Sequence, residues 1–266
     1  MNKGIVVFLA VAGLTASQAS ATLLTYEGFN YTVGNNIDNQ NGGTGWDANW
    51  GQFLGGASSY TSVAGSLADP TSTLATSGNH VDTAGTFGGR YNAFPGYGAN
   101  GTTAFFSILM RPDSAAAASG FFGLQLFNNT GQGDLFIGKN GSGPNYGLEH
   151  GSTDVFSSVA ATVSQTVFLV VRADYTSGND TFRLYVNPTS GTEPGTADAT
   201  VTYNIGTQNG LGLNAGGATS FDEIRIGTTF ADVTPSLVPE PGTLSLVAVG
   251  LVSLLGYRFR RGNQRS

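Results

Sequence analysis

Apolar and polar residues alternate along several short stretches in the second half of the chain, a pattern typical of β-strands with one buried face. Phe182, Leu184 and Val186 are expected on one face of such a strand. Arg183 and Tyr185 lie between them and are expected on the opposite face. Strands bounded by Gly, Asn, Pro or Ser are predicted at Thr103–Met110, Phe121–Phe127, Asp134–Gly138, Thr166–Tyr175, Thr181–Asn187, Thr200–Ile205 and Phe221–Gly227.

The last of these strands carries charged residues within the same alternation. Its two faces are expected to consist of Phe221, Glu223 and Arg225 on one side and Asp222, Ile224 and Ile226 on the other. Only Ala115–Ser119 suggests a helical turn, so little helix is expected. Closely spaced strands without helical periodicity between them predict an all-β fold, a two-sheet antiparallel sandwich of the jelly-roll type.

The first third of the domain, Thr22–Gly101, is less regular. Leu24, Tyr26 and Phe29 are expected as inward positions of a first strand, and the dense Asn, Asp and Gly that follow predict loops. The only two tryptophans, Trp46 and Trp50, stand in one such loop. Two interpretations remain open, because the rings could form a platform for a sugar or could cover one end of the core.

The N-terminus, Met1–Ala21, has the features of a secretory signal peptide. Lys3 precedes an apolar stretch, and small residues with the A-x-A pattern at Ala19 and Ala21 predict cleavage after Ala21. The alternative, a permanent N-terminal anchor, agrees poorly with the short apolar run and the clear cleavage pattern.

The C-terminus has three parts in a fixed order, a proline-bracketed glutamate, an apolar stretch and a basic end. The apolar stretch, Gly242–Phe259, would extend roughly 27 Å as a helix at about 1.5 Å per residue, which is close to the thickness of a bilayer core. The basic end contains Arg258, Arg260, Arg261 and Arg265. Arginines concentrated at one end predict a transmembrane helix with that end in the cytoplasm. A buried C-terminal core helix is the alternative.

The short motif before the apolar stretch consists of Val238, Pro239, Glu240 and Pro241. Together with the span and the arginines after it, this segment resembles the PEP-CTERM sorting signal of Gram-negative bacteria. The resemblance implies export, transient anchoring in the inner membrane and processing near the tripeptide by an exosortase, which is the expected partner. The chain is therefore divided into a signal peptide (1–21), an exported domain (22–235) and a sorting signal (236–266).

The charge of the region between the two signals limits its partners. Lys139 and five arginines oppose 16 acidic residues between Thr22 and Leu237, a net charge of −10. Such a surface repels phosphate, so nucleic acid is not an expected partner. The chain contains no cysteine, so no disulfide can stabilise it in an oxidising envelope.

A second resemblance covers the closing strands. TVFLVVRADY, DTFRLYVNP and FDEIRIGTTFADVTP are similar to the closing strands of concanavalin-like, or laminin-G-like, jelly rolls. The glycosidase branch of that fold carries carboxylates spaced as E-x-D-x-x-E along one strand, and this chain has no such pattern. Asp222 and Glu223 are adjacent, so alternation would direct them to opposite faces and they could not flank a glycosidic bond together. No enzymatic activity is therefore predicted.

Calcium is the one cofactor left open. Laminin-G-like domains often hold this ion at a rim, so the resemblance implies that a set of loop carboxylates could bind it here. The candidates are Asp134, Asp154, Asp174 and Asp180. No spacing in the sequence forces these four side chains together.

We expect a non-enzymatic cell-surface or extracellular-matrix protein, with an extracellular polysaccharide as a possible ligand of the Trp46–Trp50 platform. Two alternatives remain, a polysaccharide-active enzyme with an unrecognised site and a purely structural matrix protein. Release of reducing ends from a glycan would favour the enzyme, saturable binding without turnover would favour the leading hypothesis, and neither would favour the structural protein.

Overall fold

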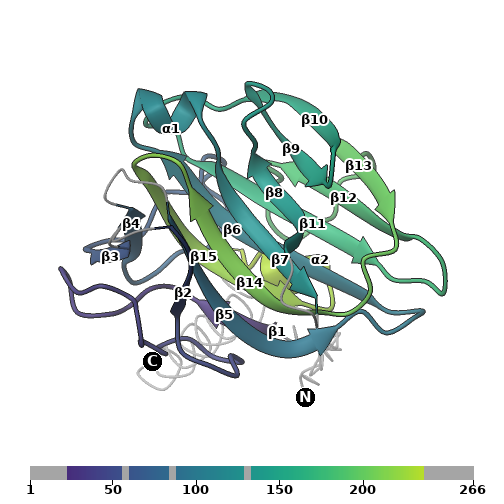
Figure 1. The fold of residues 1–266 in the computed structure, drawn as a ribbon, viewed down its shortest axis with the longest axis horizontal. Coiled ribbons are helices and arrows are strands. Elements are labelled where there is room, and N and C mark those ends of the chain that lie inside the picture. The colour runs from purple at the N-terminus through teal and green to yellow at the C-terminus, as the bar shows by residue number, and fades with distance from the viewer. Residues whose placement is uncertain (1–22, 56–59, 84–87, 129–132, 237–266) are drawn as a thin grey trace, which may run out of the picture.

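Two antiparallel β-sheets pack face to face in the computed structural model, which describes residues 23–55, 60–83, 88–128 and 133–236 (Figure 1). The expected signal peptide, the apolar stretch 242–259 and every predicted residue of the sorting motif and basic tail lie outside these ranges. Within the part of the chain that is described, no helix is both long enough and apolar enough to cross a bilayer.

The first sheet, called sheet A, has the strand order β13-β12-β11-β6-β15-β4-β3, and β1 also pairs with β15. Its strands are β1 (Leu23–Glu27), β3 (Tyr60–Val63), β4 (His80–Thr83), β6 (Thr103–Pro112), β11 (Val167–Asp174), β12 (Asp180–Val186), β13 (Ala199–Tyr203) and β15 (Thr219–Gly227). The central strand β15 pairs with β6 along one edge, and β4 and β1 share its other edge.

The second sheet, called sheet B, has the order β10-β9-β8-β7-β14-β5-β2. Its strands are β2 (Gly51–Gly55), β5 (Gly88–Tyr97), β7 (Phe122–Asn128), β8 (Gly133–Lys139), β9 (Asn145–His150), β10 (Thr153–Ala160) and β14 (Gln208–Ala215). Successive strands from β4 to β7 alternate between sheet A and sheet B, and so do successive strands from β13 to β15. The strands of these two segments pair with each other, β14 with β5 and β7, and β15 with β4 and β6. This nested connectivity is that of a jelly roll.

The predicted all-β sandwich is confirmed, with 51% of residues in strands and 5% in helices. All seven predicted strands occur, each within two residues of its expected ends. The predicted helical turn is α1 (Ala115–Ser119), in which the Ser114 side chain accepts a hydrogen bond from the amide of Ala117 at 3.1 Å. A second helix, α2 (Phe230–Val233), begins with a capping box between Thr229 and Asp232.

The hydrophobic core between the sheets takes one face of every long strand. The predicted alternation of β12 is confirmed, because Phe182 and Leu184 are buried between the sheets and Tyr185 is directed outward. A second, smaller cluster lies on the outer face of sheet A, where α2 and the segment 67–74 cover it. Its buried members are Leu67, Leu74, Phe105, Leu109, Phe168, Val170, Tyr185, Phe230 and Val233.

The predicted orientation of the first strand is wrong for Leu24 and Tyr26, whereas Phe29, just after the strand, is buried in the core as predicted. Thr25 and Glu27 are the buried residues of β1, whereas Leu24 and Tyr26 are half-buried. Glu27 is only 1% exposed. Its carboxylate accepts hydrogen bonds from the amide of Phe29 at 2.7 Å, the hydroxyl of Tyr31 at 2.5 Å and the indole N–H of Trp50 at 2.9 Å. These three donors satisfy the buried carboxylate, so polar residues take the inward positions.

The predicted alternation of β15 is also wrong, because a β-bulge interrupts the strand between Asp222 and Arg225. Glu223 has a φ of 54°, in the left-handed region. The extra residue shifts the phase by one, as bulges do. Phe221, Ile224 and Ile226 therefore all belong to the core between the sheets, and the three charged side chains lie together on the outer face.

Asp222 and Glu223 hold the covering segment on this outer face. Asp222 accepts hydrogen bonds from the hydroxyl of Ser66 at 2.5 Å and the amide of Leu67 at 2.8 Å. Glu223 accepts one from the amide of Ser77 at 2.6 Å and forms an ion pair with Arg225. Both carboxyl groups are fully buried. Burial, and then the nearby charge of Glu223, raise the pKa of Asp222 to about 8.

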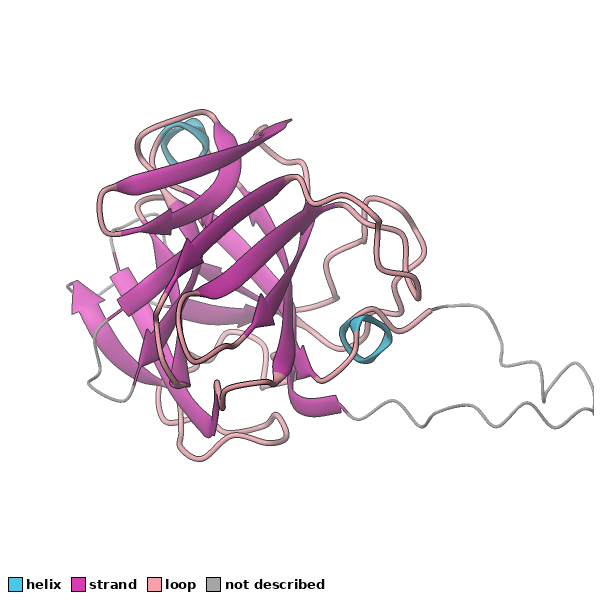
Figure 2. Cartoon of the chain, turned by 90° about the vertical axis from the view of Figure 1, so that its right-hand side faces the viewer, coloured by secondary structure: helices cyan, strands magenta, loops and turns pink. Residues whose placement is uncertain are grey.

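The C-terminal end of the described domain is fixed to the same covering segment. The amide of Ala75 donates to the carbonyl of Pro235 at 2.8 Å, and Leu74 forms a β-bridge with Ser236. Because β1 and α2 both adjoin β15, the first and last described residues lie on the same side of the molecule (Figure 2).

We predict that the exported region, residues 22–236, loses stability as the pH rises from about 4 to about 8. The unfolded state releases the Asp222 proton near the ordinary pKa of 3.8, whereas the folded state keeps it to about 8. The folded state therefore binds more protons within this window, and the free energy of unfolding falls with pH by at most about 1.4 kcal/mol per unit for one group.

Asp222→Asn is expected to make this slope shallower in urea unfolding at several pH values, and Asp47→Asn, at an exposed carboxylate, is the control. Part of the slope should persist, because burial also raises the pKa of Glu27 and Glu223. The stability of Asp222→Asn at a single pH is not part of this prediction, because its amide N–H₂ would face Ser66 or the Leu67 amide, which donate to Asp222 in the wild type. An unchanged slope would contradict the assignment.

Candidate functional site

The outer face of sheet B carries a row of polar and aromatic side chains that crosses four neighbouring strands. Gln125 on β7 pairs with Phe136 on β8, Phe136 pairs with Glu149 on β9, and Glu149 pairs with Asp154 on β10. Leu124, Leu126, Leu135, Ile137 and Leu148, which alternate with these positions, all belong to the core. The row therefore lies on the outer face.

The adjacent row on this face consists mostly of glycine. In order across the strands it runs Asn214, Gly123, Gly138, Gly147 and Phe156. The aromatic rings occupy the space that side chains would take. A Cβ on Gly123 would lie 2.7 Å from Cζ of Phe136, and one on Gly147 would lie 3.0 Å from Cδ1 of Phe156. The phenylalanine rings thus rest against the glycine backbone.

A hollow of about 250 Å³ opens over these rows. It is lined by Phe121, Gln125, Phe136, Asn140, Gly141, Glu149 and Asn214. Asn214 is 8% exposed, and its Oδ1 has no hydrogen-bond partner in the described structure. A buried amide oxygen without a partner is costly in a folded protein, so a hydrogen-bond donor from outside the described residues is expected at this atom.

The side chains around the hollow suit a polyhydroxylated ligand. The side chains of Gln125 and Glu149 make no hydrogen bond with any residue that the structure describes, and both residues are only partly exposed. Phe156, at 36% exposure, is one of the few exposed large apolar side chains described. Aromatic faces next to amides and a carboxylate can contact the apolar faces and the hydroxyls of a sugar ring together.

The two tryptophans lie elsewhere, in the core end near β1. Trp50 is fully buried, and its indole N–H is bound by Glu27. Trp46 packs against it at 5.5 Å between ring centroids and donates to the carbonyl of Tyr26 at 3.1 Å. The geometry agrees with their alternative role of covering one end of the core, because Trp50 presents no ring face to solvent.

Three of the four candidate calcium ligands can be placed, and these three have separate surroundings. Asp174 binds Arg172, Arg183 and the Thr103 hydroxyl, and Asp180 accepts the amides of Thr176 and Ile205. Asp154 lies in the cross-strand row of sheet B, and the side chain of Asp134 is outside the description. No group of three or more His, Cys, Asp or Glu that could hold a metal ion occurs among the described residues.

Sequence reasoning named only Asp154 on the sheet B face, as a calcium candidate, although one signal for its partner Glu149 was available. Gly151 and Ser152 separate β9 from β10, and a two-residue turn beginning with glycine is typical of a β-hairpin. Recognising that hairpin would have placed Glu149 and Asp154 opposite each other. No local signal could have identified Asn214, because it follows the glycine-rich part of β14 and stands between two core residues, Leu213 and Ala215.

Comparison with known families gives one match, at the C-terminus. Residues 237–261 match the PEP-CTERM protein-sorting motif, so the chain carries the sorting signal that its C-terminal sequence resembles. This match covers the tail and contains no information about the domain before it. A comparison with curated proteins finds no match.

Comparison with solved structures finds β-rich carbohydrate-related proteins of low sequence identity. An endo-1,3-beta-glucanase from Streptomyces sioyaensis is 13% identical, with a TM-score of 0.49, over 80% of this chain and 98% of the glucanase chain. Domain 4 of an extracellular arabinanase from Geobacillus stearothermophilus, in complex with arabinotriose, is 16% identical, with a TM-score of 0.47, over 80% and 97% of the two chains. Similarity at this level does not extend either protein's activity to this chain.

We predict that Gly123→Ala destabilises the domain by roughly 1–3 kcal/mol, the usual cost of overpacking. The added methyl group would meet the carbonyl oxygen of Ile137, a backbone atom that cannot rotate away. The measurement is the thermal unfolding midpoint of residues 22–236. Gly141→Ala is the matched control, because a Cβ there meets no atom within 4 Å. Equal midpoints for the two variants would show that the glycine row is not closely packed.

Proposed function

We propose that this chain, which carries a PEP-CTERM sorting motif, is an exported, non-enzymatic surface or matrix protein whose domain binds a polysaccharide along the outer face of sheet B. The observation that supports this most directly is the buried, unpartnered Oδ1 of Asn214 at the hollow beside the phenylalanine rings. A ligand hydroxyl would supply the missing hydrogen bond.

The direction of the two rows supports a chain-like ligand. The glycine row runs across the strands from β14 to β10, a distance of about 19 Å at the usual spacing between strands, and the polar row runs beside it from β7 to β10. Phe156 lies at one end of this path, Asn214 at the other, and Gln125 and Glu149 flank its middle. A linear oligosaccharide lying across the strands would contact all four side chains, whereas a single sugar would contact only some of them.

Export and a C-terminal membrane anchor that an exosortase processes follow from the sorting motif. The finer topology is part of the proposal. The stretch 242–259 would span the inner membrane, with Arg258 at its cytoplasmic end and Arg260, Arg261 and Arg265 beyond it in the cytoplasm. An exosortase would then act near Val238, Pro239, Glu240 and Pro241 and leave the domain at the cell surface or in the extracellular matrix.

A second candidate function, glycan cleavage, is favoured by one observation. Glu149 and Asp154 occupy directly paired positions on adjacent strands of the same face. The Cβ atoms of directly paired residues lie about 4.5–5.5 Å apart. Two carboxyl groups built on them can therefore reach the separation of about 5–5.5 Å that retaining glycosidases use. The pair differs from Asp222 and Glu223, which are fully buried and inaccessible to a substrate.

We predict that residues 22–236 bind at least one member of a panel of neutral polysaccharides without releasing reducing ends. Phe156→Ala and Gln125→Ala should each weaken binding roughly three- to tenfold in isothermal titration calorimetry, the effect of losing one ordinary contact. Val33→Ala and Gln165→Ala remove comparable exposed side chains away from sheet B and should leave affinity unchanged.

Loss of binding in the control variants alone would contradict the assignment of the face. Release of reducing ends by the wild type, abolished by Glu149→Gln, would replace the binding function with catalysis. Neither binding nor release across the panel would leave the purely structural alternative.

The sorting proposal predicts that changing Pro239, Glu240 and Pro241 to alanine blocks processing but not membrane insertion, since none of the three lies in the apolar stretch 242–259. The mass of the membrane-bound chain, measured in a host that carries the sorting enzyme, should stay at the precursor value in the triple variant and fall in the wild type. Equal loss of the tail from both would reduce the tripeptide to a linker.

A further inference from the structure

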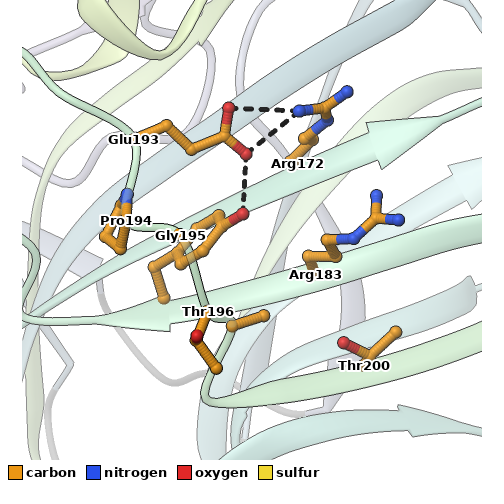
Figure 3. A pocket seen from close by; sticks show the side chains of 9 residues that line it. Arg172, Arg183, Glu193, Pro194, Gly195, Thr196 and Thr200 are labelled. Atoms are coloured by element: carbon orange, nitrogen blue, oxygen red, sulfur yellow. Dashed lines mark hydrogen bonds and ion pairs between the residues drawn. The ribbon is translucent and has the colours of Figure 1, made fainter.

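A second and larger hollow, of about 580 Å³, lies on the outer face of sheet A (Figure 3). Arg172 on β11, Arg183 on β12 and Thr200 on β13 are paired across the three strands. The two arginines form the floor of the hollow, and Thr200 lies at its rim. The segment 193–197, which connects β12 to β13, forms one wall. This hollow is separate from the sheet B face, because the two lie on opposite outer surfaces of the sandwich.

The two arginines are unusual neighbours. Like charges at directly paired positions of antiparallel strands destabilise a sheet. Here two carboxylates offset the repulsion, since Asp174 binds both arginines and Glu193 binds Arg172. Burial alone would raise the pKa of Asp174, but hydrogen bonds from Thr103 and Arg172 hold it below its usual value. Asp174 therefore stays charged and orients both guanidinium groups.

Glu193 is held as a carboxylate ligand would be. Nη1 of Arg172 donates to both of its oxygens, at 3.2 and 3.1 Å (Figure 3). The hydroxyl of Tyr185 donates to one of them at 2.6 Å. Burial and the neighbouring Glu193 raise the pKa of Tyr185, so this hydroxyl keeps its proton. Glu193 itself stands on a connecting segment rather than a strand, so a competing carboxylate can replace it without disturbing the sheet.

Arg183 retains unused hydrogen-bond donors. Only its Nη1 is bonded, to Asp174, and its Nε and Nη2 have no partner among the residues the structure describes. The side chain is 38% exposed, so these donors reach solvent within the hollow. Thr196 and Thr200 are both exposed at the rim, where their hydroxyls can bind a hydroxylated ligand.

The other described cations whose side chains can be placed are committed elsewhere. Lys139 is buried and bound to the carbonyls of Ser119 and Gly120. Arg225 is buried against Glu223, and Arg111 binds Asp113 at 2.5 Å. In this part of the chain, the hollow on sheet A is therefore the place where two arginines face solvent together.

We propose that this hollow binds the carboxylate of an acidic sugar, such as a uronic acid unit, and that Glu193 occupies the arginine site when no ligand is bound. The planar guanidinium fork matches a carboxylate in a bidentate geometry, which favours a carboxylate over a neutral sugar. The threonine hydroxyls at the rim suit the hydroxyl groups of the same sugar unit. The strongly acidic domain repels a polyanion at long range. The affinity should therefore be modest and should depend on direct contacts within the hollow.

The test uses the full chain in detergent and two matched probes, tetragalacturonate and its methyl ester, in isothermal titration calorimetry. The free acid should bind at least tenfold more tightly than the neutral ester. Arg183→Gln should weaken binding of the acid roughly tenfold, the effect of losing one charge-assisted hydrogen bond. Arg111→Gln removes a positive charge from the same sheet and should leave binding unchanged.

Glu193→Gln provides the sharper test, because it should strengthen binding several-fold by removing the competing carboxylate. A variant that misfolds cannot gain affinity, so this result does not depend on the stability of the arginine variants. Equal binding of acid and ester, equal losses in Arg183→Gln and Arg111→Gln, or no gain in Glu193→Gln would each overturn the proposal. Phe156→Ala, on sheet B, should not affect this probe, which separates failure here from failure of the sheet B site.

Discussion

The structure depends on the burial of two adjacent carboxylates at the bulge of β15. The bulge directs Asp222 and Glu223 to the same side, where they accept the hydroxyl of Ser66 and the amides of Leu67 and Ser77. These bonds fix the segment that covers the outer face of sheet A, and that segment in turn holds α2 and the end of the domain. A regular strand could not do this, because one of the two carboxylates would point into the core.

The covering segment makes the two outer faces of the sandwich different. Part of sheet A is closed by apolar packing of Leu74 and Phe230 over Phe168, and the arginines remain open beyond it. Sheet B has no corresponding cover over its central strands within the described chain, and its outer face is built from glycine rows with rings resting on them. Both open regions present side chains that bind sugars, one through neutral hydrogen-bonding groups and one through charge.

Strands with clear alternation, such as β12 with Phe182 and Leu184, could be predicted from the sequence because side-chain burial alone determines their pattern. The bulge at Glu223 could not, since its cause is a set of hydrogen bonds to residues more than a hundred positions away in the chain. The inward Glu27 was missed for a different reason, because its partners Tyr31 and Trp50 come from a loop that has no regular pattern. The glycine-rich β14 has the composition of a turn, and only the rings packed on its face, such as Phe127 over Gly212, explain why it is a strand.

The candidate sites show the same division. Both hollows combine side chains from several strands, so no linear motif contains them, and the residues of sheet B come together only through the register of β7, β8, β9 and β10. The sorting signal is the opposite case, because its residues are consecutive in the sequence and could be recognised without a structure. Chemistry assembled by strand pairing requires the three-dimensional structure.

The attachment of the chain end to Leu74 and Ala75 has a mechanical consequence. The matched sorting motif begins at residue 237, directly after Ser236, which is still bridged to the domain. A tensile load applied at the C-terminus would therefore act first on this bridge, on the hydrogen bond between Ala75 and Pro235 and on the short helix α2. Breaking these contacts would lengthen the free C-terminal segment before any force reached β15. The contacts at the point of attachment would therefore unfold first and protect the sandwich.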